Sequence, residues 1–296
     1  MQISRRRILI AGAAATALTT TGVPRPQAAP MPIEEQLGAL EDRYNAKVGF
    51  YGRDLASDRA VAWRADDLFA TCSAFKAYVA GAILRKDQQG EIRLADEVFI
   101  DPALFVPVAS PMTEPNLGGW MPLSDLCAAA VRQSDNTATN LMVEILGGPA
   151  SVTEFARAVG DDRTWMVRWE TELNTAYPGD PRDTTSPRGM GTGFKNMLLG
   201  DVFDEPHRAQ INEWMRTIVT GDTRIRAGLP PGWTVADKTG AGDYASTNDI
   251  GVAFGPHGER LVLSVMTRTR AADPEAPALN ALIADVTRVA VPWLIA

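Results

Sequence analysis

A serine and a lysine in the first third of the chain have the spacing that nucleophilic catalysis needs. Ser73 and Lys76 lie in the segment TCSAFK (71–76), just before an apolar-periodic run that predicts a helix over 77–84. Residues three apart share a helix face, so the hydroxyl and the amine would be neighbours. A serine becomes a strong nucleophile when a base takes its proton, and a lysine whose pKa is lowered by desolvation can be that base. Alone, the S-x-x-K pattern is common, and a helix-capping serine beside a solvated lysine is the more ordinary explanation.

Two further short motifs could present polar groups to the same cleft. SDN (134–136) lies between helical patterns at 124–132 and 137–146, where a bend can expose a hydroxyl and an amide. KTG (238–240) closes a predicted strand, and its glycine leaves backbone groups open at the sheet edge. Each motif by itself is also explained by ordinary turn chemistry.

The order and spacing of the three motifs carry more information than any one of them. Ser134 follows Ser73 by 61 residues, and Lys238 follows Ser134 by 104, in the order helix, bend and strand. In these motifs the chain resembles the class A serine β-lactamases. The resemblance implies an α+β fold, an αβα sandwich in which a five-stranded antiparallel sheet is flanked by terminal helices. It places the active site where the sheet meets an inserted all-helical domain.

The segment 168–183 (RWETELNTAYPGDPRD) is similar to the Ω-loop of the class A enzymes along nearly its whole length. The resemblance implies that Glu170 activates the deacylating water and that Asn174 binds the same water. General-base help of this kind contributes roughly 10²- to 10⁴-fold. It also implies that Arg168 and Asp183 pair across the neck of the loop. Taken alone, Glu170 would be a surface acid in an acidic protein, but here it stands in register with Asn174.

The resemblance assigns the remaining catalytic roles. Ser134, near Lys76, matches the residue that passes a proton to the lactam nitrogen during acylation. The base that takes the proton of Ser73 is either Lys76 or, through a water, Glu170, and the sequence leaves both open. The backbone N–H groups of Ser73 and Ala241 match the oxyanion hole, where losing one donor typically costs on the order of 10²- to 10³-fold.

Further positions match the family's substrate-binding pattern: Asn136, Arg224, Lys238, Thr239, Gly240 and Asp243. β-Lactams carry a carboxylate, which Lys238, Thr239 and Arg224 would bind. Asn136 would bind the side-chain amide of the substrate. Asp243, just past the end of the strand, would tune selectivity for cephalosporins.

Three positions complicate the resemblance. Arg226 lies close to Arg224 and competes with it for the substrate carboxylate, although we expect Arg226 to be a structural ion-pair residue. Ala109 stands where the family often has an aromatic residue that gates the cleft, so stacking on the substrate should be weaker. Some members of the family have a disulfide at the position of Cys72, but Gly242 occupies the partner position in this chain. We therefore expect Cys72 to be a buried free thiol.

The elements that position these residues follow from hydrophobic periodicity. We expect helices over 32–44 and 277–294, and strands over 47–55, 60–64, 233–239, 247–254 and 260–268. Helical patterns dominate the middle of the chain. β structure at both ends with helices between them predicts one sheet built from both termini. The predicted domains are an α/β subdomain of 30–69 and 216–296, and an all-helical subdomain of 70–215 that contains the Ω-loop.

The first 29 residues have the pattern of an export signal. The segment SRRRIL (4–9) is basic, an apolar Ala-rich stretch runs to about residue 18, and small residues reach 28–29. The paired arginines resemble a twin-arginine signal, and an ordinary secretory signal is the alternative. The apolar stretch is shorter than the roughly 20 residues of a membrane-spanning helix. We therefore expect cleavage and a periplasmic or extracellular protein in a bacterium.

Composition argues against several other classes of protein. With 45% hydrophobic and 22% charged residues among 296, the chain is expected to be globular. Its net charge is −7, and loss of the four arginines of 1–29 makes it −11, which argues against nucleic acid or anionic membranes as partners. His207 and His257 lack metal-ligand spacing, so we expect no metal and no cofactor. The expected partner is a small β-lactam, and the expected state is a monomer.

The sequence therefore predicts a class A β-lactamase, which would open the lactam amide of penicillins, cephalosporins or both through an acyl-enzyme on Ser73 and confer antibiotic resistance. A D,D-peptidase of cell-wall synthesis shares the three motifs, and a β-lactam sensor would acylate once and stop. Glu170 and Asn174 in register argue against both alternatives. A serine esterase on the same scaffold is a further alternative, since a fold does not fix its substrate.

Overall fold

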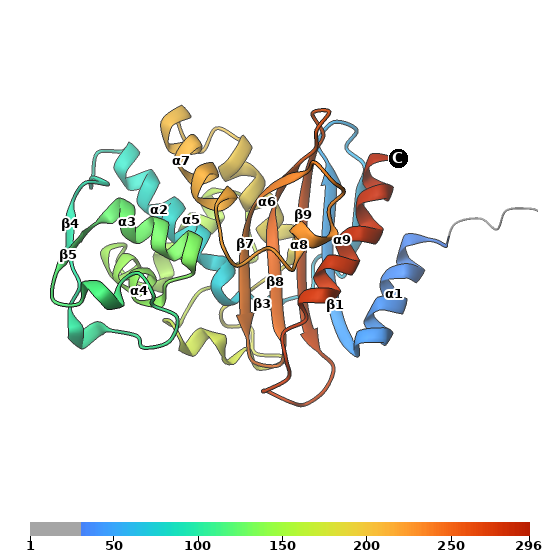
Figure 1. The fold of residues 1–296 in the computed structure, drawn as a ribbon, viewed down its shortest axis with the longest axis horizontal. Helices are drawn as coiled ribbons and strands as arrows, with labels where there is room; N and C mark the ends of the chain where they lie inside the picture. Colours follow the sequence, from blue (N-terminus) through green and yellow to red (C-terminus); the bar gives the residue numbers. More distant parts are fainter. Residues whose placement is uncertain (1–30) are drawn as a thin grey trace, which may run out of the picture. The chain divides into compact units, whose positions relative to one another are not determined.

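Residues 31–296 are described by a computed structural model, and the predicted leader at 1–29 lies outside the described residues. The main sheet has five strands in the order β2-β1-β9-β8-β7, and every neighbouring pair is antiparallel (Figure 1). The strands are β1 (Ala46–Asp54), β2 (Ala60–Trp63), β7 (Thr234–Gly242), β8 (Ser246–Phe254) and β9 (Arg260–Thr269). Two strands from early in the chain thus pair with three from its end, which confirms the predicted sheet.

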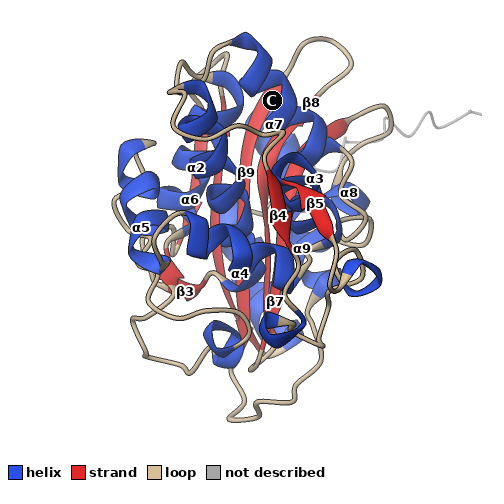
Figure 2. Ribbon diagram, turned by 90° about the vertical axis from the view of Figure 1, so that its left-hand side faces the viewer, coloured by secondary structure: helices blue, strands red, loops and turns tan. Residues whose placement is uncertain are grey.

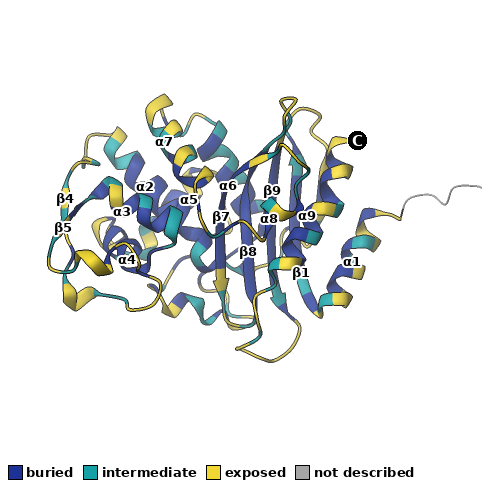
Figure 3. Cartoon of the chain, in the orientation of Figure 1, coloured by how far each residue is buried: buried dark blue, intermediate teal, exposed yellow. Residues whose placement is uncertain are grey.

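Helices cover both faces of this sheet. α1 (Ile33–Tyr44) and α9 (Asn280–Ile295) pack on one face, and α6 (Pro187–Leu199) packs on the other (Figure 1). Val265 of β9 joins the core formed with α1 and α9, whereas its neighbour Met266 joins the core that contains α6, because side chains alternate across a strand. With both faces covered, nearly every residue of β8 and β9 is buried, as the dark strands in Figure 3 show.

The remaining long helices form a layer of their own around α2 (Lys76–Gln88). The first two turns of α2 are buried throughout, as expected of a helix that other helices surround (Figure 2). Residues 32–296 form one compact unit, and the finer division at 69/70 and 215/216 remains a prediction. Four helices pack against α2: α3 (Leu123–Ala128), α4 (Asn136–Ile145), α5 (Pro149–Ala158) and α7 (Glu205–Arg216).

Short elements complete the fold and refine two predicted helices. Ser73 lies in a 3₁₀ turn that leads directly into α2, and the helix predicted at 124–132 consists of α3 followed by a π-helical turn. Both turns keep the helical hand, so the sequence periodicity resembles that of one α-helix. Two small strand pairs are β3 (Phe69–Ala70) with β6 (Thr184–Thr185) and β4 (Glu97–Phe99) with β5 (Trp120–Pro122). The remaining short elements are the 3₁₀ turns η1 (Cys72–Phe75), η2 (Pro102–Leu104), η3 (Glu114–Asn116) and η5 (Glu172–Thr175), the π turn η4 (Ala129–Gln133) and the short helix α8 (Ile225–Gly228).

Candidate active site

The sheet edge and the Ser73 turn lie in direct contact. η1 packs against β7, and a Cβ placed on Gly240 would lie 2.7 Å from the carbonyl oxygen of Thr71. Only glycine permits so close an approach, which explains the last residue of the KTG motif. Asn248 of β8 donates a side-chain hydrogen bond to the same carbonyl at 3.0 Å. The fold therefore brings Ser73 and the KTG motif, which are far apart in sequence, to one cleft.

Two polar groups, one from Ser73 and one from Lys76, meet at one buried carboxylate oxygen of Glu170. The Oγ of Ser73 donates to Oε1 of Glu170 at 3.3 Å, and Nζ of Lys76 lies 3.1 Å from the same Oε1. The side chains of Lys76 and Glu170 are fully buried. Burial lowers the pKa of Lys76 below its ordinary value, and the Glu170 carboxylate offsets only part of that effect. A hydroxyl beside buried groups that can exchange its proton is the arrangement that activates a serine.

Ser134 lies between two lysines. Its Oγ is 3.4 Å from Nζ of Lys76 and 3.3 Å from Nζ of Lys238. Ser134 has a left-handed backbone with φ 60° at the end of η4. The next residue, Asp135, caps α4 by accepting a hydrogen bond from the N–H of Ala138. The turn and the cap together fix the hydroxyl between the two amines, where it can transfer a proton.

Asn136 contributes its side chain to the same centre. Its Oδ1 accepts a hydrogen bond from Nζ of Lys76, and its Nδ2 donates to the carbonyl oxygen of Val108 at 2.8 Å. One amide thus connects the SDN bend both to Lys76 and to the loop around residue 108.

Lys238 is fully buried at the base of the cleft, and its pKa is lowered to about 7. The largest cause is burial, followed by the positive charges of Lys76 and Arg224. Besides its bond to Ser134, Nζ of Lys238 donates to the carbonyl oxygen of Thr239 at 3.1 Å. The charge of this amine therefore changes near neutral pH.

Glu170 is held through both its backbone and its side chain. Asn140 accepts from the N–H of Glu170 at 3.0 Å and donates to its carbonyl oxygen at 2.8 Å. Asn174 donates from Nδ2 to Oε2 of Glu170 at 2.6 Å, so the two residues that the sequence places in register are in contact. The other carboxylate oxygen faces Ser73. The sequence does not predict Asn140, because an asparagine in a helical pattern carries no mark of a distant backbone partner.

An ion pair closes the neck of the Ω-loop. Arg168 donates from Nε to Oδ2 of Asp183, as predicted, and Asp183 is fully buried. Oδ1 of Asp183 accepts from the N–H groups of Val167 at 2.7 Å and Arg168 at 3.0 Å. The backbone carbonyl of Asp183 accepts from the N–H of Thr71 at 2.8 Å. One residue therefore joins the two ends of the loop and attaches them to the Ser73 turn.

Asp183→Asn should destabilise the folded protein by about 3 kcal/mol, because it removes the buried carboxylate that pairs with Arg168 and leaves that guanidinium with the more distant Asp180, at 3.9 Å. Thermal unfolding followed by circular dichroism would show this as a lower Tm. Asp66→Asn is the matched control, since Asp66 pairs with Arg188 at the surface, where such a pair contributes about 1 kcal/mol or less. Equal melting temperatures for Asp183→Asn and the wild type would contradict the role of this pair.

A cavity of about 600 Å³ opens over these groups, large enough for a drug-sized ligand. Lys76, Glu170 and Lys238 lie behind its wall and reach the wall through hydrogen bonds to Ser73 and Ser134. All the predicted site residues are thus in the wall or directly behind it. Those in the wall are Ser73, Ser134, Asn136, Asn174, Arg224, Thr239, Gly240, Ala241 and Asp243.

Arg224 belongs to the cavity wall, and its guanidinium is partly engaged. Nη1 donates to the carbonyl oxygens of Gly240 at 2.8 Å and Asn248 at 2.7 Å, and Nε donates to an asparagine side chain. Nη2 has no hydrogen bond to any residue in the described range, so it is the nitrogen that an anion can use. Thr220, which the sequence does not single out, shares a hydrogen bond between hydroxyls with Thr239 and also lines the cavity.

Two expectations about neighbouring residues are confirmed. Cys72 is buried and unpaired, and a Cβ on Gly242 would lie only 2.8 Å from its Sγ, so glycine occupies the position facing the thiol. Burial raises the pKa of Cys72 far above its usual range, and the same holds for the other buried free thiol, Cys127. Arg226 pairs with Asp237 at 2.8 Å, as expected of a structural residue.

Two other kinds of site are absent from residues 31–296. No group of three histidine, cysteine or acidic side chains there is placed to hold a metal ion. No helix in that range has both the length and the apolar character needed to cross a bilayer.

Comparison with known proteins gives matches over nearly all of the described chain. The model of the beta-lactamase enzyme family matches residues 32–294. Beta-lactamase FAR-1 of Nocardia farcinica is 42% identical over 256 residues, which cover 86% of this chain and 81% of the relative. Beta-lactamase AST-1 of Nocardia asteroides is 39% identical over 297 aligned positions, covering 97% of this chain and 95% of the relative.

Solved structures match the same region. A beta-lactamase from Desulfarculus baarsii has a TM-score of 0.86 at 42% identity and covers 89% of this chain and 97% of its own. A mutant of the last common ancestor of Gram-negative bacteria class A beta-lactamase has a TM-score of 0.84 at 43% identity, covering 88% of this chain and 98% of its own. The similarity therefore includes the elements that surround the Ser73 cavity.

Proposed function

The chain belongs to the class A β-lactamases, and on that premise we propose that it hydrolyses the lactam amide in two steps, through an ester on Ser73 and then by water that Glu170 activates. The observation that carries the proposal is that Ser73 Oγ, in the cavity wall, and Lys76 Nζ, behind it, both lie within 3.3 Å of Oε1 of Glu170. Penicillins, cephalosporins or both would be the substrates.

Acylation needs a group that removes the proton of Ser73. Oε1 of Glu170 accepts a hydrogen bond from Ser73, and Nζ of Lys76 bonds the same oxygen. The proton can therefore leave into the Lys76–Glu170 pair, and the two members act as one proton-sharing unit. Ser73 Oγ then attacks the lactam carbonyl carbon, the carbon–nitrogen bond breaks, and the ring nitrogen takes a proton.

Ser134 is suited to deliver that proton to the nitrogen. Its hydroxyl lies on the cavity wall and contacts the amines of Lys76 and Lys238, either of which can replace the proton that it gives away. The negative oxygen of the tetrahedral intermediate needs donors that are already in place, and we assign that role to the backbone N–H groups of Ser73 and Ala241.

Deacylation needs a water beside a carboxylate. Asn174 and Glu170 are hydrogen-bonded to each other, and Asn174 is part of the cavity wall. We propose that they hold a water between them, that Glu170 takes its proton, and that the hydroxide attacks the ester carbonyl and releases Ser73. This contact distinguishes the proposal from a peptidase or a sensor, neither of which requires rapid hydrolysis of a β-lactam ester.

Substrate binding should weaken as the pH rises through 7. We assign the β-lactam carboxylate to Lys238, Thr239 and Arg224. The pKa of Lys238 is lowered to about 7, so its ammonium form is present below that pH and is lost above it. Well above its pKa, the charged fraction falls roughly tenfold for each pH unit. The value of kcat/KM for a cephalosporin with a free carboxylate should therefore decline above pH 7, which a pH–rate profile at constant ionic strength measures.

Lys238→Arg provides the comparison for this profile. A guanidinium keeps its charge throughout the alkaline range, so the decline in kcat/KM should move to higher pH in the variant. An alkaline limb at the same pH in both proteins would assign the decline to another group and contradict the role of Lys238.

We also propose that the protein is exported through its N-terminal segment and acts as a monomer outside the cytoplasm. The basic, apolar and small-residue pattern of 1–29 supports export. N-terminal sequencing of the exported protein, together with its mass in solution, tests cleavage and oligomeric state.

Substrate stacking at Ala109, which lines the cavity without an aromatic ring, should be weak.

Turnover of a chromogenic cephalosporin, followed by absorbance, is the direct test of the proposed function. Intact-mass spectrometry of the wild-type enzyme soon after mixing with a penicillin belongs beside it. Rapid turnover with no lasting adduct supports the two-step mechanism. A long-lived adduct on the wild type would instead indicate a penicillin-binding peptidase or a sensor.

A further inference from the structure

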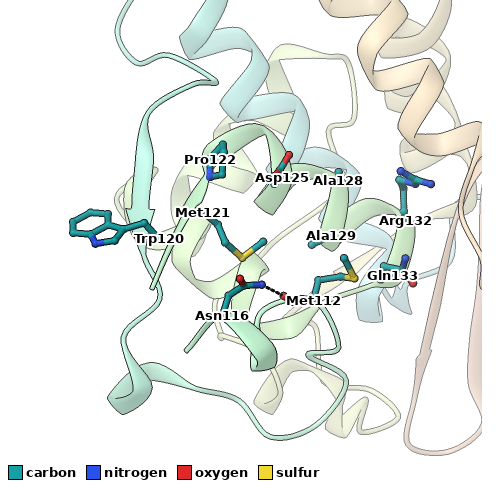
Figure 4. A pocket seen from close by; sticks show the side chains of 10 residues that line it. All are labelled: Met112, Asn116, Trp120, Met121, Pro122, Asp125, Ala128, Ala129, Arg132 and Gln133. Atoms are coloured by element: carbon teal, nitrogen blue, oxygen red, sulfur yellow. Dashed lines mark hydrogen bonds between the residues drawn. The ribbon is translucent and has the colours of Figure 1, made fainter. Parts of the chain in front are cut away.

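A second cavity, of about 390 Å³, lies in the helical layer beside the active site (Figure 4). It is formed by α3, the π turn η4 and the chain from residue 112 to β5. Only one of its residues, Gln133, also lines the Ser73 cavity. The lining residues are Met112, Asn116, Trp120, Met121, Pro122, Asp125, Ala128, Ala129, Arg132 and Gln133.

Arg132 brings a positive charge to this cavity. No acidic side chain in residues 31–296 lies within ion-pairing distance of its guanidinium, although other arginines of the described chain form such pairs. Its Nε is buried and has no hydrogen-bond partner. A buried donor without a partner is costly, and an anion would satisfy it. The side-chain amide of Gln133, beside it, likewise has no hydrogen bond within the described chain.

Apolar side chains line the middle of the cavity, and charged side chains of opposite sign, Arg132 and Asp125, also belong to its lining. Figure 4 shows the side chains of Met112 and Met121 on either side of Ala129, with Arg132 and Gln133 together at one end. Asp125 is exposed, and no cation of the described residues pairs with it. Its negative charge disfavours an anion at its own position, so a singly charged ligand would turn its anionic group toward Arg132.

We propose that this cavity binds a small organic monoanion, a carboxylate with an aromatic or aliphatic body. The carboxylate would accept hydrogen bonds from the guanidinium of Arg132, which can form two parallel bonds with it. The body would lie against the thioethers of Met112 and Met121, which adapt to irregular apolar shapes and make favourable contacts with aromatic rings. The site is separate from Ser73, so it does not depend on the proposed mechanism.

Nuclear magnetic resonance of the whole chain, labelled with ¹³C at the methionine methyl groups, tests this site directly. Signals of Met112 and Met121 are identified from the variants Met112→Leu and Met121→Leu. Titration with phenylacetate should shift both signals in a saturable way. Phenylacetamide, which has nearly the same shape but no charge, should not.

Two substitutions should change the affinity in opposite directions. Arg132→Gln should weaken phenylacetate binding at least about tenfold, because the charged partner is lost. Asp125→Asn should strengthen binding, because the repelling charge at the other end is removed. Arg93→Gln, at an exposed arginine outside both cavities, should leave the affinity unchanged. Melting curves of each variant establish that it is folded.

Three results would overturn the proposal. The first is the lack of any saturable shift at Met112 and Met121, including the case in which phenylacetate binds only beside Lys238. The second is equal binding of phenylacetate and phenylacetamide. The third is wild-type affinity in folded Arg132→Gln. Each of these results is independent of whether the protein hydrolyses a β-lactam, so failure of this proposal is distinguishable from failure of the proposed function.

Discussion

Ser73→Ala should lower kcat/KM for a β-lactam by on the order of 10⁵- to 10⁶-fold, the loss seen when a serine hydrolase loses its nucleophile. Without Oγ, no ester can form, and the Lys76–Glu170 pair has no hydroxyl to deprotonate. The oxyanion donors and the cavity remain, so the variant should still bind substrate. Absorbance-monitored hydrolysis measures the loss, and intact-mass spectrometry with a penicillin should show no covalent adduct.

Ser124→Ala is the matched control for this substitution. Ser124 lies on α3, outside the Ser73 cavity, and its hydroxyl has only a 3.5 Å contact to the adjacent Asp125. Its removal should leave kcat/KM near the wild-type value. Turnover by Ser73→Ala at more than a trace rate, or a penicillin adduct on that variant, would refute the acyl-enzyme mechanism.

Glu170→Gln should accumulate the acyl-enzyme. The amide is nearly the same size as the carboxylate and can keep the contact with Asn174, but it cannot take a proton from water. Deacylation should therefore slow by roughly 10²- to 10⁴-fold, the usual contribution of a general base. Intact-mass spectrometry should show an adduct of the full penicillin mass that persists on the variant and is absent from the wild type.

The rate at which this adduct appears also separates the two candidate bases for acylation. If Lys76 deprotonates Ser73, the adduct should form on Glu170→Gln at close to the wild-type rate. If Glu170 is the base, adduct formation should slow as well. Glu172→Gln, an exposed glutamate two residues along the same loop, is the control and should turn over normally. Wild-type deacylation in Glu170→Gln would exclude Glu170 as the activating carboxylate.

The sheet and the candidate catalytic centre are predictable because the strand patterns and the short motifs each lie within a few residues, and because the motifs follow one another in the order of the family. The strands at both ends of the chain are compact β-rich runs between turn residues, and the structure places them within a few residues of the expected bounds. Ser73 and Lys76 are neighbours in sequence, and so are the members of SDN and KTG. The family pattern supplies what no single motif contains, which is the distance between them.

The contacts that support the centre are not predictable from local patterns. Asn140 binds the backbone of Glu170 across 30 residues, and Asn248 binds the carbonyl of Thr71 across 177. Their partners are peptide groups, which every residue has, so neither sequence position marks the pairing. The π turn η4 is hidden for a different reason, because its apolar spacing resembles that of the α-helix before it.

Arg224 and Arg226 show how three-dimensional placement resolves a sequence ambiguity. The two residues are of the same type and only two positions apart. Residues two apart at a helix start do not face each other, and α8 begins between these two. Arg226 accordingly meets the buried carboxylate of Asp237, whereas Arg224 lines the Ser73 cavity.

If Lys238 and Arg224 bind the substrate carboxylate as proposed, the two lysines around Ser134 couple substrate binding to proton uptake. Lys76 is one cause of the lowered pKa of Lys238, so the charge of one disfavours the charge of the other. A bound carboxylate reverses that effect, because it stabilises the ammonium form of Lys238. Near and above pH 7, each anionic β-lactam that binds therefore draws protons from the solution. The heat of binding will consequently depend on the ionisation enthalpy of the buffer. The cleft will also bind anions in preference to neutral ligands, because only an anion stabilises the ammonium form of Lys238.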